Sequence, residues 1–106
     1  MERPLQAILI SGEKCRDDVI ARTKNTTIRY GFRDYVIGTR VMVCCPILNW
    51  CVSRTITEVL HSFLKDLPVK YMQDNGSRDL TDTLFQLNRL YPGITENSQV
   101  TFVRWV

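Results

Sequence analysis

The pattern of hydrophobic and polar positions is clearest in the middle of the chain. Residues 41–45 form a compact apolar run, and after a turn around Pro46 and Asn49 extended structure resumes from Trp50 to about Phe63. The second strand has two faces: Trp50, Val52, Ile56 and Leu60 on one, and Cys51, Thr55, Val59 and Phe63 on the other. The pattern predicts a long hairpin, bulged because its second strand is long.

Three further strands and two helices are expected around this hairpin. The strands are predicted at 5–10, 25–30 and 99–105, and the first helix at 13–22. The second helix begins after Asp79 as N-cap, with Asp82 at the capping-box position, and ends at Pro92-Gly93. Its inward stripe consists of Leu80, Leu84, Leu87 and Tyr91. Residues 65–77 are polar and predicted to be irregular.

Strands grouped in the middle with separate helices are typical of an α+β fold. The expected architecture is a small mixed β-barrel of about five strands with two flanking helices, closed by the C-terminal strand. The length of 106 residues and the hydrophobic fraction of 44% suit one domain covering 1–106. No apolar run is long enough to span a bilayer. Residues Met1–Pro4 lack the apolar core of a signal peptide, so a cytoplasmic location is expected.

The four cysteines are expected to be reduced, because nothing in the sequence indicates export. Cys45 and Cys51 are placed facing each other across the hairpin. No Cys-x-x-Cys pair exists and His61 is the only histidine, so neither a structural zinc site nor a Cys–His enzyme is favoured.

The net charge of +3 is unevenly distributed. Between residues 14 and 40, seven basic residues against three acidic ones give +4, which leaves −1 for the rest of the chain. Such a region fits a phosphate-bearing or nucleotide ligand, although a solvated face with scattered arginines explains the charge equally well.

The strand at 25–30 is the first candidate for a functional site. Asn25, Thr27 and Arg29 share one face of it, and Lys24 precedes them. These hydroxyl, amine and guanidinium groups on a rigid strand can bind and polarise a small polar ligand.

The segment 17–29, in which a helix leads into Lys24 and then to a threonine and arginine on a strand, resembles the signature segment of the ASCH domain family. The chain length, a strand starting after Gly38 and a late helix ending in Tyr91-Pro92-Gly93 add to the resemblance, which covers nearly the whole chain from Leu9. The chain is most similar to the small bacterial ASCH proteins that hydrolyse N4-acetylcytidine to cytidine and acetate.

The resemblance implies a PUA-like barrel, a fold that also binds RNA, and a metal-independent amidohydrolase site made of a lysine, a threonine and a glutamate. Lys24 and Thr27 match the first two. The family's glutamate stands in a Gln-Glu-Asn context where this chain has Gln73-Asp74-Asn75, so Asp74, one methylene shorter, is assigned as the third catalytic residue. Arg22-Thr23 replaces the family's glycine before the lysine.

In this interpretation Thr27 attacks or positions water, and Lys24 is the base, with its pKa lowered by burial and by Arg29. Asp74 protonates the leaving amine or orients the base. Arg29, Asn25 and Tyr30 are predicted to bind the substrate, with Tyr30, Phe32 or Trp50 stacking on the ring. The chemistry needs no cofactor and no metal.

The alternative function is a non-catalytic ASCH module that binds RNA through the same basic cleft. Each assignment also has a structural alternative. Thr27 suits a strand by propensity, Lys24 suits a helix C-terminus, and Arg29 suits a structural ion pair. Asp74 before Asn75-Gly76 is an ordinary turn residue. A nuclease is not supported, because no acid cluster or histidine pair is present.

Overall fold

The computed structural model describes residues 6–106. Leu5 of the first predicted strand, and the Met1–Pro4 segment on which the expected absence of a leader rests, lie outside the described residues. The elements are β1 (Gln6–Leu9), α1 (Cys15–Ile20), β2 (Thr26–Tyr30), β3 (Arg40–Cys45), β4 (Trp50–Phe63), α2 (Val69–Asp74), α3 (Leu80–Leu90) and β5 (Gln99–Trp105). Short 3-10 turns occupy Pro46–Leu48 and Leu64–Asp66.

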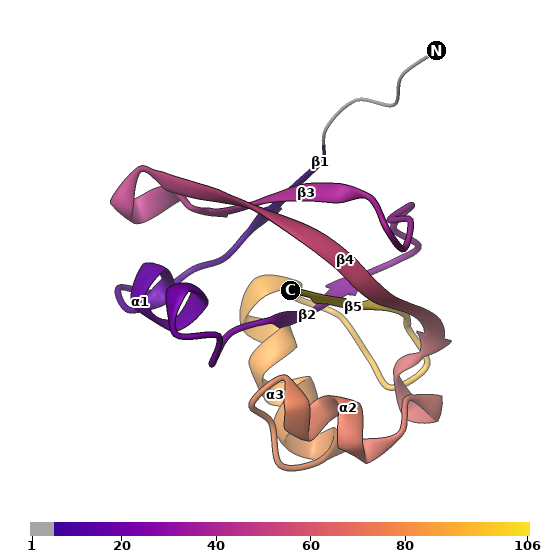
Figure 1. The fold of residues 1–106 in the computed structure, drawn as a ribbon. Coiled ribbons are helices and arrows are strands. Elements are labelled where there is room, and N and C mark those ends of the chain that lie inside the picture. Colours follow the sequence, from indigo (N-terminus) through magenta and orange to yellow (C-terminus); the bar gives the residue numbers. More distant parts are fainter. Residues whose placement is uncertain (1–5) are drawn as a thin grey trace.

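The five strands form one curled sheet in the order β1-β3-β4-β5-β2. β1 runs parallel to β3, and the remaining pairs are antiparallel. The 14-residue β4 links two layers, because its first half pairs with β3 and its second half with β5 (Figure 1). The predicted α+β fold with a small mixed sheet of five strands is confirmed. The sheet curls into a half-barrel in which β5 lies between β4 and β2, rather than into the expected barrel closed by the C-terminal strand.

A bulge in β4 changes which side chains share a face. The register between β4 and β5 shifts between Ile56 and Glu58, which inserts one residue and inverts the alternation. Val59 therefore packs with Ile56 in one core, and Leu60 packs in the other. The bulge is confirmed, but the predicted faces of Val59 and Leu60 are wrong.

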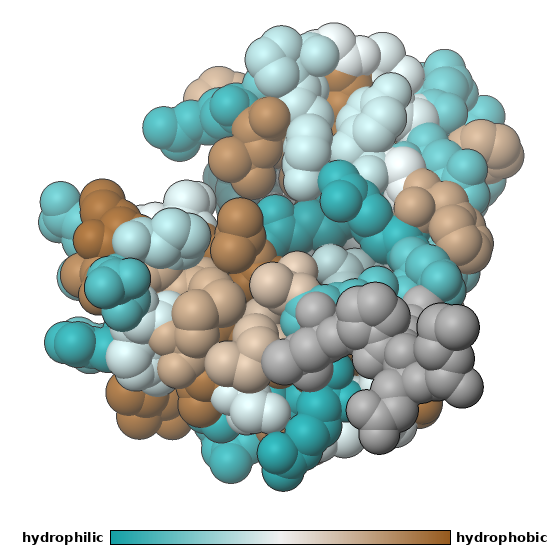
Figure 2. All heavy atoms as spheres, turned by 90° about the horizontal axis from the view of Figure 1, so that it is seen from above, coloured by the Kyte–Doolittle hydropathy of each residue, from teal (hydrophilic) through white to brown (hydrophobic). Residues whose placement is uncertain are grey.

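Two hydrophobic cores result from this arrangement. The first lies between the two layers and α1, with Val19, Val43 and Trp105 among its buried members. The second lies between β2, β5 and the pair α2 and α3, with Ile28, Leu87 and Phe102 buried in it. Seen from above, hydrophobic side chains also gather on part of the outer surface, surrounded by hydrophilic ones (Figure 2).

The helices follow local rules where those rules are strong. Asp79 caps α3, since its Oδ1 accepts from the Asp82 N–H at 2.9 Å. α1 is shorter than predicted and is followed by Arg22 at φ 63°, a left-handed conformation that ends the helix. The prediction of irregular structure for residues 65–77 is wrong where α2 forms. This helix has only six residues and no side-chain N-cap, so the sequence carries little indication of it. No helix of residues 6–106 is both long and apolar enough to cross a membrane.

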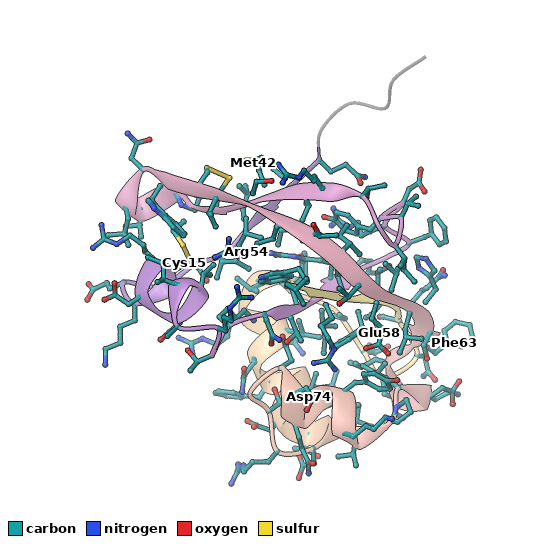
Figure 3. The ribbon with its side chains drawn as sticks, in the orientation of Figure 1. Cys15, Met42, Arg54, Glu58, Phe63 and Asp74 are labelled. Atoms are coloured by element: carbon teal, nitrogen blue, oxygen red, sulfur yellow. A yellow bond between two sulfur atoms is a disulfide. The ribbon has the colours of Figure 1, made fainter. Side chains whose placement is uncertain are left out.

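The cysteines are paired, which corrects the expectation of reduced thiols. Cys15 of α1 is bonded to the buried Cys45, and Cys44 to Cys51 (Figure 3). The register of the hairpin sets Cys44, not Cys45, opposite Cys51, so the predicted partner is wrong by one residue. Neighbouring side chains on β3 point to opposite faces, which sends Cys45 inward to α1.

Candidate functional site

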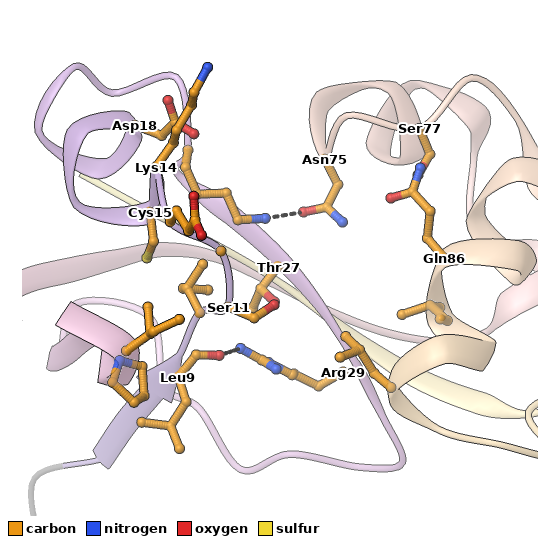
Figure 4. Close-up of a pocket in the computed structure, with 18 of the residues that line it drawn as sticks. Leu9, Ser11, Lys14, Cys15, Asp18, Thr27, Arg29, Asn75, Ser77 and Gln86 are labelled. Atoms are coloured by element: carbon orange, nitrogen blue, oxygen red, sulfur yellow. Dashed lines mark hydrogen bonds between the residues drawn. The ribbon is translucent and has the colours of Figure 1, made fainter. Parts of the chain in front are cut away.

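A pocket of about 770 Å³ opens beside β2, between the α1 region and the α2–α3 region (Figure 4). One wall is the loop of residues 9–15, joined by Pro46 and Ile47. The opposite wall comes from residues 75–90. Lys24, Thr27 and Arg29 lie between the two walls. A volume of this size is in the range of small-molecule sites.

The structure brings together three of the predicted site residues. Thr27 and Arg29 are two positions apart on β2, so their side chains leave the same face of the strand. Thr27 is only 5% exposed, and its side chain lies in the centre of the pocket (Figure 4). The Arg29 guanidinium donates to the Leu9 carbonyl, which links β2 to β1.

The Lys24 amine is set up to lose its proton easily. Burial and, to a smaller extent, the Arg29 charge lower the pKa of Lys24, and Asp18 opposes both; the net effect takes the pKa from 10.5 to about 8. Nζ donates to Asn75 Oδ1 at 3.1 Å. An amine with this pKa is partly neutral near physiological pH, as a general base requires.

Asn75 is one of the pocket residues that the sequence did not predict, and it contacts Lys24 directly. Its Oδ1 accepts from Lys24 Nζ and also from Thr26 Oγ1, at 2.8 Å. The sequence did contain a sign of Asn75, because it follows Asp74, the residue assigned as catalytic. Asn75-Gly76 was interpreted only as a turn.

Asp74 is placed outside the pocket lining. Its Oδ2 accepts from Arg104 Nη2 at 2.6 Å, and Arg104 Nε also donates to Glu58 at 3.0 Å. Asp74 and Glu58 lie in the same part of the molecule, near α2 and β4 (Figure 3). The carboxylates that do line the pocket are Glu13 and Asp18.

The other predicted substrate contacts also lie elsewhere. Asn25 and Tyr30 do not line the pocket, and the Tyr30 ring lies 5.7 Å from that of Tyr91. Phe32 stacks on His61 at 4.2 Å, and Trp50 packs against the first core. The apolar part of the described pocket wall is aliphatic instead, formed by Leu9, Ile10, Pro46, Ile47, Leu87 and Leu90.

Metal ligands do not gather at this pocket or elsewhere in the described chain. Among residues 6–106, no group of three or more histidine, cysteine, aspartate or glutamate side chains is arranged to hold a metal ion. With both disulfides formed, the described cysteines offer no free thiol either.

Comparison with known proteins identifies the fold. No family model matches the sequence, and no curated protein matches it significantly. Among solved structures, the chain is similar to an ASCH domain from Lactobacillus crispatus JV V101, with a TM-score of 0.65 and 12% sequence identity. The match covers 95% of this chain and 77% of that one. The chain therefore has the fold of an ASCH domain, as the resemblance predicted.

Proposed function

We propose that this ASCH-fold protein is an amidohydrolase that removes the acetyl group from N4-acetylcytidine to give cytidine and acetate. The observation that carries the proposal is a lysine with a pKa of about 8 in the same pocket as a buried threonine hydroxyl. A lysine that activates a hydroxyl nucleophile is a known variant of the serine-protease arrangement.

The first step forms an ester between Thr27 and the acetyl group. Neutral Lys24 takes the proton of the Thr27 hydroxyl as Oγ1 attacks the acetyl carbonyl carbon. The carbonyl oxygen becomes an oxyanion, which Arg29 stabilises with the N–H groups not used by Leu9. When the C–N bond breaks, the protonated Lys24 returns the proton to N4, and cytidine leaves.

The second step releases acetate. Lys24, neutral again, takes a proton from water, whose oxygen attacks the ester carbonyl; the proton then returns to Thr27 Oγ1. In this scheme one lysine serves as base and acid in turn. Asp74, which is paired with Arg104, is not required as an acid.

The shape and polarity of the pocket suit a nucleoside. Aliphatic side chains on both walls, Leu9 and Ile47 on one and Leu90 on the other, offer surfaces against which a flat pyrimidine can pack, and the polar groups of β2 lie between them. The pocket lining has a formal charge of about +1 when all its ionisable groups are charged, which is compatible with an uncharged substrate. The groups counted are Lys14, Lys24 and Arg29 on the basic side and Glu13 and Asp18 on the acidic side.

The experiment is to incubate the purified protein with N4-acetylcytidine and follow cytidine by chromatography. Wild type is expected to release cytidine, whereas Lys24→Ala and Thr27→Ala abolish release. Both variants should still show cooperative unfolding in urea, which shows that they are folded. Lys65→Ala and Thr57→Ala, which change the same residue types outside the pocket, are matched controls that retain activity. Full activity in either pocket variant would refute the role given to that residue.

The RNA-binding alternative has a different outcome in the same set of proteins. A binding module releases no cytidine, but retards structured RNA in electrophoresis with an affinity that falls as salt rises.

A further inference from the structure

Asn75 has no role in the steps above, yet it contacts the residue that moves the proton. Its carbonyl oxygen accepts from Lys24 Nζ at 3.1 Å and from Thr26 Oγ1 at 2.8 Å. The ammonium form of Lys24 can only donate, so its contact assigns the near end of the amide as the oxygen, to which the Thr26 hydroxyl also donates. The Nδ2 end is consequently directed away from Lys24, toward the side of the pocket lined by Ser77 and Gln86 (Figure 4).

The backbone holds this side chain in place. Asn75 ends α2, and its N–H donates to the carbonyls of Tyr71 and Met72, both at 3.1 Å. Gly76, at φ +89°, turns the chain immediately afterwards, a conformation that glycine adopts without strain. On the other side, the ion pair of Asp74 with Arg104 ties the end of α2 to β5.

We propose that Asn75 is a positioning residue that holds the Lys24 amine in the pocket it shares with Thr27 and presents its own amide N–H groups to the acetyl carbonyl oxygen of the substrate. The inference rests on the proposed amidohydrolase function and extends it to a fourth side chain. The neutral amide of Asn75 faces Lys24, whereas the carboxylate of the preceding residue, Asp74, faces Arg104.

The neutrality of Asn75 matters because Lys24 lies near charges of both signs, and a further charge would change its pKa. Arg29 on β2 disfavours the protonated amine, and Asp18 on α1 favours it. Glu13 and Lys14 reach the same pocket from the loop before α1. Asn75 approaches from α2 and adds an acceptor without a charge, so the amine is held in place and remains easy to deprotonate. A carboxylate here would favour the ammonium form.

The test measures the protonation of Lys24 directly, in full-length protein labelled with 13C at the lysine Cε. The Lys24 resonance, assigned by its loss in Lys24→Arg, is titrated in wild type, Asn75→Asp, Asn75→Ala and Asn97→Asp. Asn75→Asp is expected to raise the pKa of Lys24 by about 1 to 3, because a carboxylate then faces the amine. Asn75→Ala removes an acceptor from the ammonium and lowers it. Asn97→Asp, the same substitution at an exposed position outside the pocket, is the matched control and leaves the pKa of Lys24 nearly unchanged.

A second arm follows turnover of N4-acetylcytidine. Asn75→Asp is expected to move the rising limb of the pH profile to higher pH by the same amount as the titration. Asn75→Ala lowers kcat by about 10²-fold with KM little changed, as for loss of one donor to an oxyanion. A substitution that merely loosens the fold would hydrate Lys24 and raise its pKa, so the lowered pKa expected in Asn75→Ala distinguishes loss of the Asn75 acceptor from loss of packing.

The two failures are distinguishable. An unchanged Lys24 titration in both Asn75 variants overturns the positioning role, whatever the activity. Absence of turnover in wild type refutes the amidohydrolase, and with it the catalytic use of Asn75, even where the titration shows that Asn75 sets the protonation of Lys24.

Discussion

Replacing Lys24 by methionine tests the electrostatics of the pocket without reference to any substrate. Methionine has a similar unbranched shape and no charge. In the wild type the pKa of Lys24 is about 8 when folded, against 10.5 for an unperturbed lysine. Between these two values the unfolded chain holds more protons than the folded one, so the stability of the wild type rises with pH.

The size of the effect follows from that difference. A difference of about 2.5 in pKa, at 1.36 kcal/mol per pH unit, corresponds to about 3 kcal/mol. The difference in free energy of unfolding, wild type minus Lys24→Met, should therefore increase by about 3 kcal/mol from pH 7 to pH 10.5. Below pH 7 the difference should be constant with respect to this group. Tyrosines and other groups titrate in both proteins and cancel in the difference.

The assay is urea denaturation of both proteins across that pH range, read by fluorescence or circular dichroism. Lys65→Met, at an exposed lysine, is the control, and its difference from wild type should stay flat. A flat difference for Lys24→Met as well would show that the folded protein does not disfavour the ammonium form, and the argument for Lys24 as a base would fail.

Two further predictions concern the scaffold. Thr101→Val should lower the free energy of unfolding by about 1–3 kcal/mol in urea denaturation, because the buried hydroxyl donates to the Gly31 carbonyl and accepts from the Arg33 N–H. Thr101→Ser keeps both hydrogen bonds, so an equal loss of stability in Thr101→Ser would contradict this reason. Removing the Cys15–Cys45 disulfide by double alanine substitution should cost about 1 kcal/mol more than removing the other disulfide, because it closes a loop of 30 residues rather than 7; equal losses would count against this chain-entropy argument.

Local patterns predicted the strands and α3 well, because alternation, capping and helix-stopping residues act within a few positions. Asp79 and Pro92-Gly93 mark α3 in the sequence as clearly as in the structure. The β2 face was equally readable, since Thr27 and Arg29 both reach the pocket. What a pattern of alternation cannot locate is an inserted residue, and the bulge at Ile56/Glu58 reversed the two faces of β4 beyond it.

The sequence alone could not predict which side chains form the pocket wall of residues 75–90, because this depends on tertiary structure. The resemblance drew attention to residues 73–75, but α2 was not recognised as a helix. Successive side chains on a helix are rotated by about 100°, so Asp74 faces Arg104 while Asn75 faces Lys24. The choice between the two required knowing where β5 places Arg104. Likewise, the pairing of Cys44 with Cys51 depended on a register that hydrophobicity alone does not determine.

The most direct test of the account is the pH dependence of kcat/KM for cytidine release from N4-acetylcytidine. The neutral form of Lys24 is the active base, so the account predicts activity that rises with pH, reaches half its maximum near pH 8 and is absent in Thr27→Ala. Release of no cytidine at any pH, or a rate that neither depends on pH around 8 nor requires Thr27, would contradict it.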